Sequence, residues 1–303
     1  MRTGFSPSGR AEARPHIGLI QFAHVYLLLL FGALFLILWA VFYAALPFLK
    51  RVGALSARVV ARASVRYARI GKFTNRYKTY APIALVVVAG GLFTAWAGDE
   101  FIDLAELVHS KSAKLQDLDA FAHAWAISKR TAAGTAFFSL ISTIGSPVGM
   151  AVLVICVAIV LALTHRYRWL LYLLVTSGGG SLLNMELKRY FERARPDIAE
   201  MLRLAHGYSF PSGHAMGSTV VLGALSYLAV RTTTHWRWKA AWLALTWTLI
   251  AAIALSRVYL GVHWISDVAA GVVAGALWVG VTTLAYETFR RIRLMRAMRV
   301  SGS

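Results

Sequence analysis

The chain has 303 residues, of which 58% are hydrophobic and 15% charged, with a formal net charge of +19 and a mean hydropathy of +0.60. Soluble domains average roughly 45–50% apolar and about 25% charged residues, so this composition excludes a disordered chain and disfavours a soluble one. A disulfide-stabilised secreted protein is excluded too, because the chain has a single cysteine, Cys156, within an apolar run. We therefore expect an integral membrane protein, and its charge indicates membrane topology before nucleic-acid binding.

Seven stretches of the chain are long and apolar enough to cross a membrane as helices, which takes about 20 mostly apolar residues. They cover residues 18–49, 82–98, 135–164, 170–187, 212–231, 240–256 and 265–286. The first stretch is longer than the apolar region of a signal peptide, which argues against cleavage. The sequence thus predicts an all-α polytopic membrane protein with three parts: an N-terminal hydrophobic helix and basic connection (1–80), a six-helix bundle (81–289) and a basic tail (290–303).

The basic residues between these stretches gather in connections that would all face one side of the membrane. Nine lie within residues 50–80, and smaller groups follow at 166–168, 231–239 and 290–299, none with an acidic residue. Acidic residues gather instead within residues 99–119, on the opposite side. Because Lys and Arg are enriched in cytoplasmic loops, the C-terminus is predicted to be cytoplasmic, and the same rule places the N-terminus outside.

Four arginines in the first basic connection recur at helical spacing and would share one helix face: Arg58, Arg62, Arg66 and Arg69. They are explained either by an interfacial helix that binds anionic lipid or by charges that only enforce membrane orientation, and both interpretations need the same residues. The segment from Asp99 to Arg130 is more polar than its neighbours, and we expect it to form a short external helix or loop.

The first polar cluster, Lys188 to Pro196, follows the fourth span at its outer end. Lys188 and Arg195 are seven residues apart, so on a continuous helix they would project from nearly the same face, two turns apart. A collar of basic residues that snorkel at a membrane edge would look the same. The orientation rule, however, makes such a cluster less expected on the outer side.

The second polar cluster, Tyr208 to His214, opens the fifth span. Pro211 before a Ser-Gly pair favours a helix start, where free backbone N–H groups make a site for an anion. Ser212 adds a hydroxyl donor, Gly213 allows a ligand close to the backbone, and His214 would face that ligand from the first turn. An ordinary capped helix start with an interfacial histidine is the alternative.

The third polar cluster, Ser256 to Asp267, joins the sixth and seventh spans. His263 and Asp267 are four residues apart and would lie one helical turn apart on one face. A carboxylate there can hold the imidazole in one tautomer and stabilise its cation, which leaves the other ring nitrogen free to attack an electrophile. A structural His–Asp pair is the alternative, but a carboxylate near the end of a span is costly unless it is paired or functional.

The predicted topology brings the three clusters to one outer face of the membrane. Cations from different clusters, such as Lys188 and Arg257, would repel by about 4 kcal/mol at about 4 Å and an effective dielectric constant near 20. An anion with several oxygens relieves this repulsion, and phosphate suits both arginine forks and a helix N-terminus. A metal site formed by His214, His263 and Asp267 is disfavoured, because nearby cations oppose a divalent ion unless phosphate accompanies it.

The motifs K-x6-R-P, P-S-G-H and S-R-x5-H-x3-D, in this order, resemble the three-part signature of the type 2 phosphatidic acid phosphatase superfamily. That superfamily includes membrane lipid phosphatases and shares its site with vanadium haloperoxidases and some soluble acid phosphatases. Every signature position is matched, by Lys188, Arg195, Pro196, Pro211, Ser212, Gly213, His214, Ser256, Arg257, His263 and Asp267. The resemblance covers roughly residues 82–286, and residues 1–80 lie outside it.

The resemblance implies a covalent mechanism in which no metal or other cofactor takes part. His263 would be the nucleophile on phosphorus, oriented by Asp267. His214 would protonate the leaving group and then activate water against the phosphohistidine. The groups that would hold the phosphoryl oxygens are Lys188, Arg195, Ser212, the Gly213 N–H and Arg257. Phosphoryl transfer depends mainly on positioning and charge stabilisation, and this set of residues is rich in both.

A site at the outer interface suits a lipid whose phosphate lies at headgroup depth. The candidates are undecaprenyl diphosphate, phosphatidic acid, phosphatidylglycerophosphate and lipid A phosphate. Arg189 and Arg193 could meet a second phosphate, which slightly favours a diphosphate, although snorkelling explains both residues equally well. The expected partners are the lipid phosphate and the bilayer, with no nucleic acid and with the oligomeric state left open.

Three other functions compete with hydrolysis. A phosphotransferase of the same family would pass the phosphoryl group to an acceptor instead of water, for example in reactions of lipid A. A haloperoxidase would need bound vanadate, and most such enzymes are soluble. A transporter would carry ionisable residues near span midpoints, whereas here the strongest cluster lies at span ends. An outward-facing site in a basic multi-span chain suggests the bacterial inner (cytoplasmic) membrane.

Overall fold

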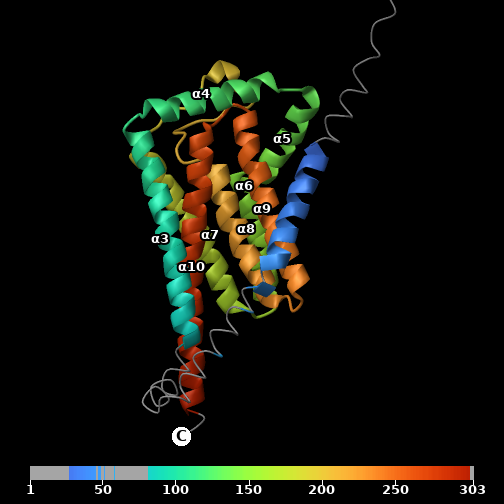
Figure 1. Ribbon diagram of the computed structural model, residues 1–303, viewed down its shortest axis with the longest axis vertical. Helices are drawn as coiled ribbons and strands as arrows, with labels where there is room; N and C mark the ends of the chain where they lie inside the picture. The colour runs from blue at the N-terminus through green and yellow to red at the C-terminus, as the bar shows by residue number, and fades with distance from the viewer. Residues whose placement is uncertain (1–26, 46, 49–50, 52–57, 59–80, 301–303) are drawn as a thin grey trace, which may run out of the picture.

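A computed structural model describes residues 27–45, 47–48, 51, 58 and 81–300, and the regular elements in these ranges are all helical (Figure 1). The prediction of an all-α protein is therefore confirmed. Most of the first basic connection lies outside the described residues, including Arg62, Arg66 and Arg69. The proposed interfacial helix in that connection stays a prediction.

The N-terminal hydrophobic stretch forms a helix over Leu27–Ala45, within the predicted 18–49. The elements that follow are α3 (Ala81–His109), α4 (Ala113–Ser128), α5 (Ala132–Ile144), α6 (Pro147–Leu163), α7 (Tyr167–Phe191), the 3-10 turn η1 (Ile198–Glu200), α8 (Gly213–Thr232), α9 (Trp236–Tyr259) and α10 (Ile265–Val300). Each predicted span coincides with one of these helices or with the pair α5 and α6. Only α4 and η1, among the described elements, correspond to no predicted span. The order of elements thus agrees with a six-helix bundle preceded by an extra helix.

Several described helices can cross a membrane, and the chain is a multi-pass membrane protein. Four are long and apolar enough by themselves: Leu27–Ala45, Gly213–Thr232, Trp236–Tyr259 and Ile265–Ala297. α5 and α6 qualify as a pair, so the described residues hold up to five spans. α3 and α7 occupy the places of the two other predicted spans without meeting this criterion. In α7 the mean hydropathy is lowered by the serines, glycines and asparagine between Ser177 and Asn184.

The predicted span 135–164 is not one unbroken helix but the bent pair of α5 and α6. α5 and α6 meet at an angle of 47°. The Ser146 side chain accepts a hydrogen bond from the Gly149 N–H at 3.0 Å, and Pro147 occupies the first turn of α6. A capping serine followed by proline starts a new helix, because proline lacks the N–H needed to continue the old one.

α10 is the long helix about which the bundle is arranged, and it packs on α3, α7, α8 and α9 (Figure 1). Glycines permit its closest approach to α8. A Cβ atom on Gly271 would lie 2.8 Å from the Ser212 carbonyl oxygen, and one on Gly275 would lie 2.9 Å from the Met216 carbonyl oxygen. Small residues let two helix backbones come together in this way. The start of α8 is thereby held against the first turns of α10.

The polar segment Asp99–Arg130 is more ordered than a short loop. α3 continues to His109, and α4 then crosses the ends of the bundle helices (Figure 1). α4 turns its polar residues Asp119 and His123 inward, while Leu118, Phe121 and Trp125 are exposed. Large apolar side chains exposed on such a helix, next to exposed polar residues such as Asp117, are expected where the helix lies along a membrane interface.

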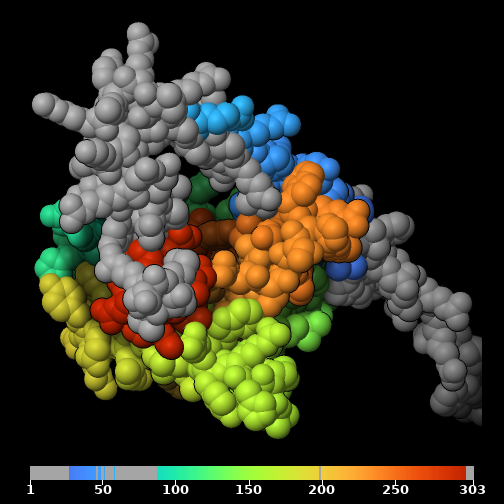
Figure 2. Space-filling view, turned by 90° about the horizontal axis from the view of Figure 1, so that it is seen from below, coloured from blue at the N-terminus to red at the C-terminus, as the bar shows by residue number. Residues whose placement is uncertain are grey.

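The opposite end of the bundle carries the basic connections between the predicted spans. The start of α7, the end of α8, the start of α9 and the C-terminal turns of α10 meet there, and Figure 2 views the molecule from this end. Their basic residues include Arg168, Arg231, Arg237 and Arg290. These basic residues therefore share one end of the molecule, while α4 and the acidic residues of the segment Asp99–Asp119 lie toward the other end, together with the basic residues of the three polar clusters. Which end faces the cytoplasm stays a prediction.

Candidate active site

The three polar clusters lie on different helix ends beneath α4. Lys188 belongs to the last turn of α7, which ends at Phe191 because Glu192 adopts a left-handed conformation with φ of 44°. Arg195 therefore lies in the following loop, and the expectation that it shares a helix face with Lys188 is wrong. The two side chains nevertheless converge on the carbonyl oxygen of Tyr208, with Lys188 Nζ at 2.7 Å and Arg195 Nη2 at 3.3 Å.

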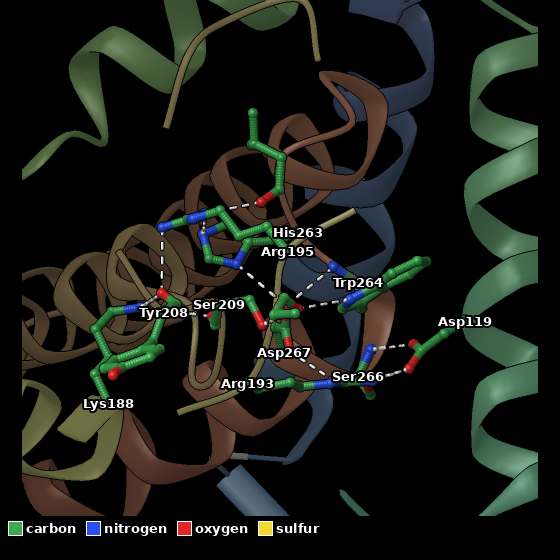
Figure 3. A network of polar contacts seen from close by, with 12 residues as sticks. Asp119, Lys188, Arg193, Arg195, Tyr208, Ser209, His263, Trp264, Ser266 and Asp267 are labelled. Carbon is green, nitrogen blue, oxygen red and sulfur yellow. Dashed lines mark hydrogen bonds and ion pairs between the residues drawn. The ribbon is translucent and has the colours of Figure 1, made fainter. Parts of the chain in front are cut away.

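Arg195 is fixed by backbone carbonyl groups and reaches the ring of His263 (Figure 3). Its Nε donates to the Gly207 oxygen at 2.8 Å, and its Nη1 donates to the Val262 oxygen at 2.8 Å. The same Nη1 lies 3.1 Å from His263 Nε2. A guanidinium can only donate, so Nε2 must be the acceptor in this contact. The proton of the neutral ring then sits on Nδ1, which lies 3.3 Å from Asp267 Oδ2.

His263 is buried in the turn between α9 and α10, outside the membrane-spanning helices. Burial lowers its pKa well below 6.5, and the charges of Arg195, Arg257 and Lys188 lower it further. Both effects disfavour the protonated ring. At neutral pH His263 is therefore neutral and keeps a lone pair on Nε2, the nitrogen that faces the cations.

The start of α8 offers a donor that no group in the described part of the chain uses. Ser212 is fully buried and precedes the first turn, yet its side chain caps nothing and Oγ has no hydrogen-bond partner among those residues. Its backbone N–H donates to the Asp267 carbonyl oxygen at 2.9 Å, which joins α8 to α10. Beside it, a Cβ atom on Gly213 would lie 3.1 Å from Asn184 Oδ1, so a side chain here would crowd the approach from α7.

Arg257, in the last turn of α9, is buried and only partly satisfied. One guanidinium nitrogen donates to the Ser142 hydroxyl of α5, while Nε has no partner within the described residues. More than nine-tenths of buried polar groups in proteins are hydrogen-bonded, so the unused donors of Arg257 and of Ser212, whose backbone contacts Asp267, indicate a binding site for a hydrogen-bond acceptor. An anion with several oxygens fits this donor set, because it would also balance the gathered cations.

His214 lies in the first turn of α8, half-buried, and within electrostatic range of His263, Arg195 and Arg257. The structure thus brings residues of all three predicted clusters to one site. It does not gather three His, Cys, Asp or Glu side chains into a metal-binding group anywhere in the described ranges.

Comparison with known proteins assigns the chain to a family. A family model described as PAP2 superfamily matches residues 169–291, which contain all three motifs. A phosphatidylglycerophosphatase B from Bacillus subtilis (strain 168) is 36% identical over 135 residues, 43% of this chain and 64% of that protein. A decaprenylphosphoryl-5-phosphoribose phosphatase from Mycobacterium tuberculosis (strain ATCC 25618 / H37Rv) is 35% identical over 136 residues, 43% of this chain and 67% of that protein.

This chain belongs to the PAP2 superfamily.

A solved structure supports the same membership at the level of the fold. The first transmembrane PAP2 type phosphatidylglycerolphosphate phosphatase from Bacillus subtilis, a crystal structure, has a TM-score of 0.59 and 26% sequence identity. The match covers 63% of this chain and 94% of that one. By sequence, the chain spans just under two thirds of the first relative's length. The family match covers α7 to α10 and leaves α4 outside.

Two arginines near this PAP2 site, Arg189 and Arg193, were considered as contacts for a second phosphate, and both are paired with carboxylates. Arg193 forms ion pairs of 2.6 Å with both Asp119 and Asp267 (Figure 3). Arg189 pairs with Glu186 at 2.8 Å on the surface of α7. The slight preference for a diphosphate therefore loses its basis.

Asp119 was overlooked as a member of the site. The sequence showed it only as one of several acidic residues on the outer side. No spacing rule relates it to Arg193 or Asp267, because the three residues come from α4, the loop after α7 and the first turn of α10. The signal available in the sequence was the spacing of Asp119 and His123, one helical turn apart between Leu115 and Ala126, which in the structure form the buried face of α4.

An apolar groove between α6, α7 and α8 ends at the start of α8. Its volume is 460 Å³, and Ile155, Leu174 and Met185 are exposed along it. The groove therefore opens on the side of the bundle, where a bilayer would lie. Its other end reaches Asn184 and Gly213, beside the unused donor of Ser212. The groove can guide an apolar chain from the bilayer to the polar site.

Proposed function

We propose that this protein is a lipid phosphatase that hydrolyses a phosphomonoester or diphosphate of a membrane lipid through a phosphohistidine intermediate. The observation that carries the proposal is neutral His263, held between Arg195 and Asp267, together with two buried, unused donors in the same site, Ser212 Oγ and Arg257 Nε. Lys188, Arg195 and the Gly213 N–H complete the set that would hold the phosphoryl oxygens. The family membership and the names of the two relatives support the same chemistry.

In the first step, His263 Nε2 attacks phosphorus and forms a P–N bond while the bond from phosphorus to the leaving oxygen breaks. The electron pair leaves with that oxygen, and protonated His214 supplies its proton. Arg195 Nη1, which lies 3.1 Å from Nε2, moves to a phosphoryl oxygen when substrate binds. Asp267 stabilises the positive charge that develops on the ring through Nδ1.

In the second step, neutral His214 removes a proton from water as the water oxygen attacks phosphorus. The P–N bond breaks, its electron pair returns to His263, and phosphate leaves. Both histidines are then restored to their starting forms. The gathered cations stabilise the charge on the phosphoryl oxygens in both steps, which is the main need of phosphoryl transfer.

The proposed substrate is a lipid phosphate of the undecaprenyl diphosphate, phosphatidic acid or phosphatidylglycerophosphate class. The groove between α6 and α8 supports a substrate with a long apolar chain. We place the site at the outer face of a bacterial inner membrane and the C-terminus in the cytoplasm. The basic end of the bundle, opposite α4, supports this orientation through the enrichment of Lys and Arg in cytoplasmic loops.

We expect the detergent-purified protein to release phosphate from lipid phosphates with EDTA present, because the site supplies cationic side chains where other phosphatases place metals. Undecaprenyl diphosphate and phosphatidic acid would be offered in parallel, with inorganic phosphate as the readout. Loss of activity with EDTA, restored by a divalent metal, would contradict the proposed chemistry. Phosphate release that requires an added acceptor lipid would identify a phosphotransferase instead.

Filling the groove is expected to harm lipid substrates far more than a soluble one. Gly178 of α7 lines the groove, and a Cβ atom on it meets no other group within 4 Å, so a leucine side chain at this position has room to start into the groove. We expect Gly178→Leu to lower kcat/KM for the lipid by roughly 10- to 200-fold relative to p-nitrophenyl phosphate. The control is Gly91→Leu on α3, which also has open space but lies outside the groove. Equal losses for both substrates would argue against the groove as a path for lipid.

A further inference from the structure

The guanidinium of Arg193 is held between two carboxylates beneath α4. It lies 2.6 Å from Asp119 of α4 and 2.6 Å from Asp267 of α10 (Figure 3). The two aspartate side chains are 2% and 0% exposed and that of Arg193 is 16% exposed, so the trio is nearly sealed from solvent. Buried charges are costly unless they are paired and hydrogen-bonded, and here every member has a partner.

Ser266 locks this trio to the start of α10. Its backbone N–H donates to Asp119 Oδ1 at 3.0 Å, and its hydroxyl donates to Asp119 Oδ2 at 2.7 Å. The same hydroxyl oxygen accepts from Arg193 Nη1 at 2.7 Å. Asp119 therefore satisfies an otherwise free N–H in the first turn of α10 from a different helix, which is a favourable place for a negative charge.

The two oxygens of Asp267 are divided between different partners. Oδ1 accepts from Arg193, while Oδ2 accepts from the Trp264 N–H at 3.0 Å and faces Nδ1 of His263 at 3.3 Å. A carboxylate engaged on both oxygens cannot rotate away from the imidazole. Arg193 thus fixes the orientation of the group that fixes His263, and Asp119 fixes Arg193.

The charges of the trio have a consequence for the reaction as well. If Arg193 were paired with Asp267 alone, the net charge beside His263 would be zero. Because Asp119 also belongs to the group, the trio carries a net charge of −1. His263 becomes positively charged when Nε2 bonds to phosphorus. A buried negative charge next to Nδ1 favours that developing cation, because charges interact strongly away from water.

We infer that Asp119 of α4 and Arg193 are positioning residues for the phosphoryl transfer, which orient Asp267 and set the net negative charge that supports His263. This inference rests on the proposed function. It gives a role in the chemistry to α4, a helix outside the region that the family match covers. Neither residue touches the transferred group, so both act through Asp267.

Two single variants test the inference by changing the net charge of the trio in opposite directions, and the double variant restores it. Asp119→Asn changes it from −1 to 0, Arg193→Gln changes it to −2, and the double variant returns it to −1. Each single variant is expected to lower kcat by about 10- to 100-fold, as is typical for partners that orient a reactive group. Arg193→Lys keeps the charge without the two-pronged geometry and is expected to recover part of that loss.

The pH dependence of kcat/KM separates this role from a merely structural one. The net charge of the trio contributes to the pKa of His263. Arg193→Gln raises this pKa and moves the acid limb of the pH profile to higher pH. Asp119→Asn lowers the pKa and moves the acid limb to lower pH. The double variant moves it back toward the wild type. The other charged or titratable groups that face His263 are the same in all variants: Lys188, Arg195, His214, Arg257 and Asp267.

The matched control is Asp117→Asn, which removes a carboxylate from the exposed face of α4 two residues from Asp119. It is expected to leave kcat and the acid limb unchanged. An acid limb that is the same in wild type, both single variants and the double variant would overturn the inference, even if kcat falls. The limb is measured on the folded, active fraction, so partial misfolding cannot mimic a shift.

A second readout does not depend on turnover. The ring of His263, labelled with ¹⁵N and assigned by its loss in His263→Ala, can be titrated directly by NMR in detergent. A higher pKa in Arg193→Gln than in the wild type supports the inference, and equal values contradict it. If the wild type releases no phosphate from any lipid, the proposed function fails, while this titration still decides the coupling of Arg193 and Asp119 to His263.

Discussion

His263→Ala is expected to abolish phosphate release, with a loss in kcat of about five to six orders of magnitude. The side chain supplies the bond to phosphorus, and no other nucleophile occupies its place between Arg195 and Asp267 in the described structure. The fold is expected to survive, because Arg195 keeps its bond to the Val262 oxygen and Asp267 keeps its bond to the Trp264 N–H. Phosphate release and thermal unfolding, both measured in detergent, check the two statements.

The control for this variant is His165→Ala. His165 is an exposed histidine in the turn between α6 and α7, at the end of the bundle opposite the site. Its removal is expected to leave turnover at the wild-type rate. Phosphate release by His263→Ala at a rate near that of the wild type would rule out the proposed nucleophile, and with it the phosphohistidine.

His214→Ala is expected to stop the reaction at a different point, which depends on the leaving group. A lipid alkoxide needs a proton to leave, so both steps are impaired with lipid and kcat falls by about 10²- to 10⁴-fold. p-Nitrophenolate leaves without a proton, so the first step continues with p-nitrophenyl phosphate while the hydrolysis of the intermediate stalls. We expect a burst of one equivalent of p-nitrophenolate, followed by slow turnover.

The burst also provides the covalent intermediate for direct detection. With ³²P-labelled substrate, His214→Ala is expected to hold acid-labile, base-stable label on one histidine, and a His214→Ala/His263→Ala double variant is expected to hold none. Label that persists in the double variant would place the nucleophile elsewhere. Wild-type turnover of the lipid by His214→Ala would remove this residue from proton transfer.

Both variants depend on the protonation state that the fold imposes on His263. Burial and the neighbouring cations keep its pKa well below 6.5, so the nucleophile is available at neutral pH. When a phosphate dianion binds among the same cations, their charge is compensated and the positive form of the ring becomes less costly. The arrangement therefore disfavours protonation of the free nucleophile while permitting the cation that forms on attack.

The sequence by itself determined the class of protein and the local parts of the site. Long apolar stretches require membrane helices, because backbone groups in a bilayer must be satisfied within the helix. The pair His263 and Asp267 was also predicted from helical spacing. The two residues do meet, but His263 precedes α10, and Asp267 reaches it by turning back over the helix start to the Trp264 N–H. Capping by Ser146 before Pro147 was a local signal as well, although the predicted span passed over it.

The tertiary structure decided which distant residues meet. Gly271 and Gly275 bring α10 against α8, so that Ser212 contacts Asp267. The turn at Glu192 sends Arg195 out of α7 and toward His263, which a helical projection from Lys188 did not predict.

Asp119 and Arg193 show most clearly what the sequence leaves open. They are 74 positions apart, and an ion pair depends on separation in space. Apolar periodicity tells which helix faces are buried, but it does not tell which charge on one helix end faces which charge on another. For that reason the sequence suggested the residues proposed to carry the chemistry, whereas only the packing of α4 across the bundle revealed the network that holds them.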